Sequence, residues 1–193
     1  DCNTDEAFAA PELVKEGIKA EKEGYDAIVI YCFSDVGIDA VRENVRIPVI
    51  GPGETSLCAA NLLCNRFVVV TTEGANIPRT YRRLMRNGIA REKMTSVQAL
   101  DIPIGELRTD PGATARYLKQ VCGRAVRQEQ ADGVILGCLG MASYGAMLEK
   151  ELPVKVFDPA FIALAYAEMS VRLGLVHSTA VYPVFQNASH VEL

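Results

Sequence analysis

Short runs of consecutive apolar residues alternate along the chain with longer segments whose apolar positions recur every three or four residues. The runs show no polar alternation, which is typical of strands covered on both faces of a sheet, and the longer segments have the spacing of helices. We predict strands at 27–31, 48–50, 67–71, 96–100, 133–137 and 154–157. We predict helices at 11–24, 37–44, 54–63, 79–87, 111–130, 144–151 and 159–173.

This regular alternation of strands and helices predicts a layered α/β fold with parallel sheets. The chain has 193 residues, of which 49% are hydrophobic. That length and composition can bury a sizeable core, and they fit one large domain or two small ones.

An internal repeat favours two domains. The segment "DAIVIYC" at 26–32 matches "DGVILGC" at 132–138, and each is followed downstream by a similar tripeptide, "IPV" at 47–49 and "LPV" at 152–154. A duplicated unit predicts two similar Rossmann-like lobes related by a pseudo-two-fold axis, with an active site in the cleft between them. We expect residues 1–64 plus 159–193 to form the first lobe and residues 65–158 to form the second.

The repeat places Cys32 and Cys138 at equivalent strand ends. A single cysteine at the end of an apolar strand is usually a core residue. Two at matching positions favour a functional role instead, because ligands bind at the carboxyl ends of parallel strands. Opposed thiols suit the inversion of a carbon centre, in which one sulfur removes a proton and the other delivers one to the opposite face. Asp35, close to Cys32, is either solvated or able to influence the thiol, and the sequence does not decide between these.

Composition excludes several other classes of function. The formal net charge is −4 and the Lys and Arg residues are scattered, so we expect neither nucleic acid nor a membrane surface as a partner. The six cysteines form no C-x-x-C pair and the chain has only two histidines, so we expect no metal. We interpret the thiols as reduced and the compartment as cytoplasmic.

The segments "IVIYCFSDVGIDAVRE", "IPVIGPGE", "FVVVTT", "ILGCLGM", "LPVKVFDP" and "LGLVHS", taken in order, resemble the hydantoin racemases and the related allantoin racemases of the aspartate/glutamate racemase superfamily. The resemblance implies catalytic cysteines at Cys32 and Cys138. It also implies cofactor-independent racemisation of 5-monosubstituted hydantoins or a similar cyclic ureide by a homo-oligomer. By the same likeness, substrate-binding groups are expected at the backbone of Phe33, Ser34, Leu139 and Gly140 and at the Thr71 hydroxyl.

Two departures from the resemblance matter. Hydantoin-type enzymes usually begin with a strand that ends in Asn-Pro-Asn, which is lacking here. Either the numbering starts after that strand, or the first lobe is short of an N-terminal strand. The amino-acid racemases of the superfamily follow their cysteines with Asn-Thr and Thr-Glu, whereas this chain has Phe-Ser-Asp and Leu-Gly-Met. That difference favours a neutral ring as the substrate. An amino-acid racemase, a decarboxylase or maleate-type isomerase of the same fold, and a non-enzymatic two-lobe binding protein remain as alternatives.

Overall fold

The computed structural model describes residues 2–183, and it divides the chain into two compact units. The first unit contains residues 1–52 and 163–193, and the second contains residues 53–162. Each unit is built around its own parallel sheet, with order β1-β2 in the first and β4-β3-β5-β6 in the second. The fold is therefore α/β with parallel sheets, as the alternating pattern predicts.

The elements follow the sequence pattern closely. The strands are β1 (Ile28–Val29), β2 (Val49–Ile50), β3 (Phe67–Thr71), β4 (Met94–Ala99), β5 (Gly133–Leu136) and β6 (Lys155–Phe157). The α-helices are α1 (Asn3–Lys22), α2 (Ile38–Asn44), α3 (Pro52–Leu63), α4 (Ile77–Arg86), α5 (Pro111–Glu129), α6 (Gly145–Glu149) and α7 (Pro159–Leu173). Short 3₁₀ turns include η3 (Ile104–Glu106) and η4 (Leu139–Met141).

The first helix differs most from its predicted range, because it begins at Asn3 and passes through Pro11. Proline lacks the N–H that would bond the carbonyl four residues earlier in the helix, and its ring collides with that carbonyl. Here Pro11 lies on the exposed side of α1, where water can satisfy the carbonyl that it leaves without a partner. The amino end of the helix is supported by the Asp5 carboxylate, which accepts a hydrogen bond from the Cys2 backbone N–H at 2.9 Å.

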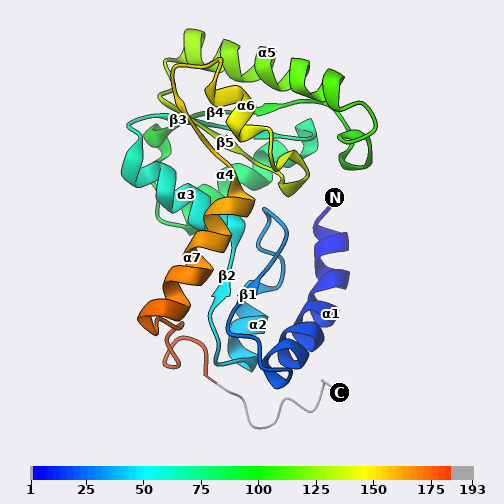
Figure 1. Cartoon of the computed structure of the whole chain (residues 1–193), viewed down its shortest axis with the longest axis vertical. Coiled ribbons are helices and arrows are strands. Elements are labelled where there is room, and N and C mark those ends of the chain that lie inside the picture. The colour runs from blue at the N-terminus through cyan, green and yellow to red at the C-terminus, as the bar shows by residue number, and fades with distance from the viewer. Residues whose placement is uncertain (1, 184–193) are drawn as a thin grey trace. The chain divides into compact units, whose positions relative to one another are not determined.

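The first unit is a three-layered sandwich of helices on a two-stranded sheet (Figure 1). One apolar cluster joins the sheet to α1 and α2 through buried residues that include Val14, Ile30 and Val41. Ile50 faces the opposite way and packs against Ala163 and Ala167 of α7. The sheet is thus covered on both faces, which explains why its strands carry no polar alternation.

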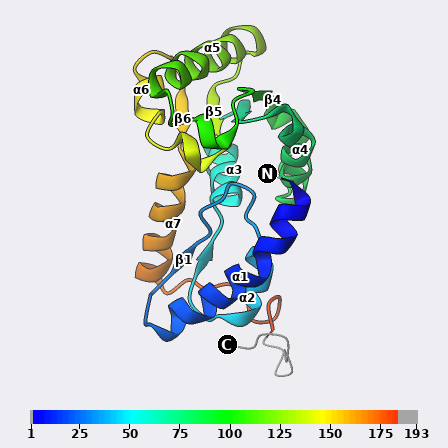
Figure 2. The same ribbon diagram turned by 90° about the vertical axis from the view of Figure 1, so that its right-hand side faces the viewer.

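In the second unit, successive residues of the central strand β3 point to opposite faces of the sheet. Val68 and Val70 pack with Val134 and Leu136 of β5 against α5 and α6, where Leu118, Cys122 and Leu148 are completely buried. Figure 2 shows α5 and α6 on one side of this sheet and α3 on the other.

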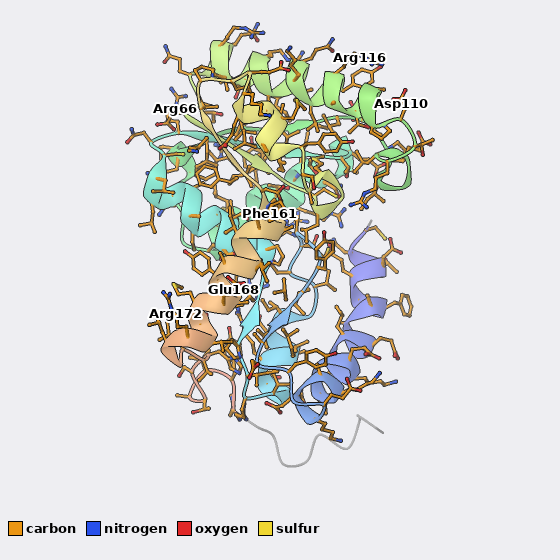
Figure 3. All side chains as sticks on the ribbon, viewed as in Figure 1. Arg66, Asp110, Arg116, Phe161, Glu168 and Arg172 are labelled. Carbon is orange, nitrogen blue, oxygen red and sulfur yellow. The ribbon has the colours of Figure 1, made fainter. Side chains whose placement is uncertain are left out.

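Helix α5 begins at a well-defined cap. Asp110 precedes it, and its side chain accepts a hydrogen bond from the Ala113 N–H at 2.8 Å. Figure 3 shows Asp110 at this end of the helix. The cap fixes where the loop from β4 ends, and that loop contributes to the candidate site.

Candidate active site

Cys138 lies two residues beyond the carboxyl end of β5, in extended backbone with φ −154° and ψ 135°. Its Sγ accepts a hydrogen bond from the Gly140 N–H at 3.3 Å. The side chain is only 9% exposed and packs at the edge of the second unit's core. Because η4 begins immediately after Cys138, the turn holds the Gly140 N–H close to the sulfur.

The two glycines that flank Cys138 are required by close approaches. A Cβ on Gly137 would lie 2.8 Å from the Val70 carbonyl oxygen, which already accepts the Gly137 N–H at 2.7 Å. A Cβ on Gly140 would lie 2.9 Å from Leu107 Cδ1 and 3.4 Å from Cys138 Sγ. A side chain at Gly137 would push against the end of β3, and one at Gly140 would push against the Leu107 side chain.

Four of the predicted site residues occupy one edge of the second sheet. Thr71 ends β3, directly after Val70, which pairs with Leu136 and accepts a hydrogen bond from the Gly137 N–H. Thr71 is 3% exposed. Leu139 is buried and Gly140 is partly exposed, both in the turn that follows Cys138. The carboxyl edge of this sheet therefore brings Thr71, Cys138, Leu139 and Gly140 together.

A buried carboxylate fixes the chain that leaves the turn. Ser143 has a left-handed φ of 80°, which is uncommon for a residue other than glycine. Its N–H donates to Asp158 Oδ2 at 2.9 Å, and the Ala160 N–H at the start of α7 donates to Asp158 Oδ1 at 3.1 Å. Asp158 is 8% exposed. It links the loop after Cys138 to a helix start, and no sequence pattern predicted this role.

Cys32 occupies the equivalent place in the first unit, three residues beyond β1. Its N–H donates to the Ile30 carbonyl at 2.6 Å, and its own carbonyl accepts the Asp35 N–H at 3.0 Å, so the cysteine begins a tight turn. The thiol is partly exposed and packs against the cluster that joins α1, α2 and the sheet. Of the two residues that follow, Phe33 is buried and Ser34 is partly exposed.

Asp35 is buried, so it is not the solvated carboxylate that the sequence left possible. It is 8% exposed and has a left-handed φ of 53°. Its carboxylate lies against Gly51, where a Cβ would be only 2.6 Å from Oδ1. The turn after Cys32 is therefore held against the end of β2 by close packing on a glycine.

Two of the other four cysteines, Cys122 and Cys58, have different surroundings from Cys32 and Cys138. All six, which lie within residues 2–183, are free thiols. Burial in α5 raises the pKa of the Cys122 thiol from its ordinary value of 9.0 to about 12. Such a thiol stays protonated and unreactive near neutral pH. Cys58, in contrast, is exposed on α3.

Among residues 2–183, no helix is long and apolar enough to cross a membrane.

Comparisons with known proteins match both the fold and the sequence of the chain. A sequence model of the Asp/Glu/hydantoin racemase family matches residues 1–167. The hydantoin racemase of Pseudomonas sp. (strain NS671) is 35% identical over 170 residues, which cover 88% of this chain and 68% of that protein. The hydantoin racemase of Paenarthrobacter aurescens is 34% identical over 180 residues, covering 91% of this chain and 75% of that protein.

The structural comparison gives the same result. The solved structure of allantoin racemase from Klebsiella pneumoniae superposes with a TM-score of 0.92 at 30% identity, covering 97% of this chain and 76% of that one. The parallel sheets and this superposition define an α/β protein with the fold of the racemases. The chain belongs to the Asp/Glu/hydantoin racemase family. The resemblance found in the sequence is thereby confirmed, and the relatives named here are isomerases.

Proposed function

We propose that this protein is a cofactor-independent racemase of 5-monosubstituted hydantoins or a related cyclic ureide, with Cys32 and Cys138 as its proton-transferring pair. The observation that carries the proposal is the repeated placement of a thiol just beyond a parallel strand, in each of the two units of a chain from this family. Both cysteines are followed by a tight turn, and neither belongs to a helix.

The proposed chemistry balances without any further reactant. A thiolate removes the proton from C5 of the ring, and the electron pair of the broken C–H bond passes into the adjacent carbonyl to give an enolate. The thiol on the other face then gives its proton to C5 as the carbonyl re-forms. The two sulfurs exchange their protonation states, so the reverse assignment serves the opposite enantiomer.

Backbone groups would supply the rest of the stabilisation. A hydrogen bond from an N–H stabilises negative charge on a sulfur, and the Gly140 N–H already makes one to Cys138. In the proposal the turns at Phe33, Ser34, Leu139 and Gly140 approach the ring through their backbone, and the Thr71 hydroxyl contributes a further polar contact. The turn Leu139–Met141 carries no charged side chain, which suits a neutral ring better than an amino acid.

The test is to incubate the protein in deuterium oxide with a single enantiomer of 5-isobutylhydantoin and, separately, of allantoin. The proposal predicts loss of optical rotation together with entry of deuterium at the chiral carbon. The spontaneous exchange of the ring C–H, measured without protein, is subtracted. Release of carbon dioxide from an arylmalonate would instead indicate a decarboxylase, and racemisation of aspartate or glutamate alone would indicate an amino-acid racemase. Binding of the ring without exchange would indicate a binding protein.

A further inference from the structure

The loop between β4 and α5 runs along the same edge of the second sheet as Cys138. Beyond β4, the Leu100 N–H donates to the Thr71 carbonyl at 2.9 Å and the Ile102 N–H donates to the Thr72 carbonyl at 3.2 Å. These bonds continue the pairing with β3 past the end of the sheet. The loop is thereby directed across the carboxyl edge, where ligands bind in such sheets.

The end of this loop is anchored at Leu107. Its carbonyl accepts hydrogen bonds from Thr114 Oγ1 at 2.9 Å and from Tyr144 Oη at 3.4 Å, and its side chain is completely buried. Thr114 belongs to α5, and Tyr144 lies in the segment that follows Cys138. The turn η3, which begins at Ile104, is consequently held in place.

Ile104 lies in the neighbourhood of the sulfur. The position that a Cβ of Gly140 would occupy lies 3.4 Å from Cys138 Sγ and 3.6 Å from Ile104 Cγ1, so these two atoms are at most about 7 Å apart. Ile104 is nevertheless 47% exposed, although Leu107 next to it is completely buried. A half-exposed branched side chain within about 7 Å of the candidate catalytic thiol is placed to contact a ligand.

We propose that Ile104 determines which C5 substituents the enzyme accepts, and that it selects apolar ones. This inference rests on the proposed racemisation, because it takes Cys138 as one of the two proton-transferring groups. A ring carbon in reacting position lies about 3–3.5 Å from the sulfur. An alkyl or arylalkyl substituent on that carbon then reaches the Ile104 side chain. Ile104 has no hydrogen-bonding group to offer the polar ureido substituent of allantoin, which would lose water on contact.

The kinetic test compares 5-isobutylhydantoin, 5-methylhydantoin and allantoin. The wild-type protein is expected to have a higher kcat/KM for the isobutyl compound than for allantoin. Ile104→Ala is expected to lower the isobutyl-to-methyl ratio of kcat/KM at least about 10-fold, the lower end of the effect that one methylene group has in an apolar pocket. Ile104→Val, which keeps the branched shape and removes one methylene group, should lower the ratio less than Ile104→Ala does. Met85→Ala, at an exposed apolar residue of α4, is the matched control.

A binding measurement separates failure of this inference from failure of the proposed reaction. Unsubstituted hydantoin is achiral, and 5-benzylidenehydantoin is planar at C5, so neither can be racemised. Calorimetry should show that Ile104→Ala weakens binding of the benzylidene compound about 10-fold and leaves binding of hydantoin unchanged. Absence of turnover with intact, Ile104-dependent binding would overturn the reaction but not the role of Ile104. Equal effects on both ligands, an unchanged isobutyl-to-methyl ratio, or a wild-type preference for allantoin would overturn the role of Ile104.

Discussion

The Gly140 N–H donates a hydrogen bond to Cys138 Sγ at 3.3 Å, from a backbone position that has no room for a side chain. The same residue thus supplies a donor to the sulfur and, because it lacks a side chain, fits against Leu107. Leu107, which lies against Gly140, is completely buried and cannot move away freely. The geometry around Cys138 therefore depends on glycine at position 140.

Replacing Gly140 by alanine is expected to lower kcat by up to about 100-fold. Its Cβ would meet Leu107 Cδ1 at 2.9 Å and shift the turn whose N–H bonds Cys138 Sγ, and misplacement by about an ångström costs that much. Overpacking against Leu107 should also lower the free energy of unfolding by about 1–3 kcal/mol. Racemisation is measured at a temperature at which circular dichroism shows the variant to be folded. Gly112→Ala is the control, since a Cβ there meets only ordinary contacts at 3.4 Å or more. Full activity of Gly140→Ala would contradict the prediction.

Replacing either Cys32 or Cys138 by serine is expected to reduce racemisation by about 10²–10⁴-fold, because a hydroxyl is a far weaker acid than a thiol in the same place. The rate is followed by polarimetry and by deuterium entry at C5. Cys58→Ser, at an exposed thiol of α3, should leave the rate unchanged. If both single variants kept the wild-type rate, the two-thiol mechanism would be wrong.

Gly51→Ala tests the packing that holds the turn after Cys32. The new Cβ would lie 2.6 Å from Asp35 Oδ1 and 2.8 Å from Ile38 Cδ1, so we expect a loss of about 1–3 kcal/mol in the free energy of unfolding. Urea denaturation measures the loss. The double variant Gly51→Ala, Asp35→Gly removes the colliding carboxylate, and glycine suits the left-handed φ at position 35. It should regain part of the stability, and no recovery would show that Asp35 is not the source of the strain.

The buried thiol of Cys122 predicts a pH dependence of stability. Its pKa is about 12 in the folded protein and 9.0 ordinarily, because burial disfavours the thiolate. Below pH 9 both states keep the proton and this group adds no pH dependence. As the pH rises from 9 towards 12, only the unfolded state releases the proton, so the free energy of unfolding falls by up to about 1.4 kcal/mol per pH unit.

Urea denaturation between pH 8 and 11 would measure this effect in the wild type and in Cys122→Ala. The variant is expected to be less stable at pH 8, because it leaves a small cavity in the core. The difference in the free energy of unfolding between the wild type and the variant should become smaller as the pH rises above 9. Parallel curves over this range would contradict the assignment.

The sequence by itself determined the alternation of strands and helices, the two strands that lead to Cys32 and Cys138, and the family. These features are local, since apolar periodicity and a repeat can be seen without knowing which segments meet. Apart from the first helix, which starts eight residues before its predicted position, every predicted α-helix and strand ends within two residues of the observed bound. Pro11 predicted a helix start at that residue. The helix instead continues on both sides of Pro11, because this residue lies on the exposed side of α1.

Only the tertiary structure decided what surrounds the two thiols. Leu107 and Ile104 reach Gly140 because β4 pairs with β3 and its loop crosses the edge of the sheet, a course that no periodicity in 100–107 encodes. Asp35 is buried because the end of β2 brings Gly51 against it. Contacts between residues far apart in sequence depend on strand order and on the course of the loops, and those are set by the packing of the whole unit.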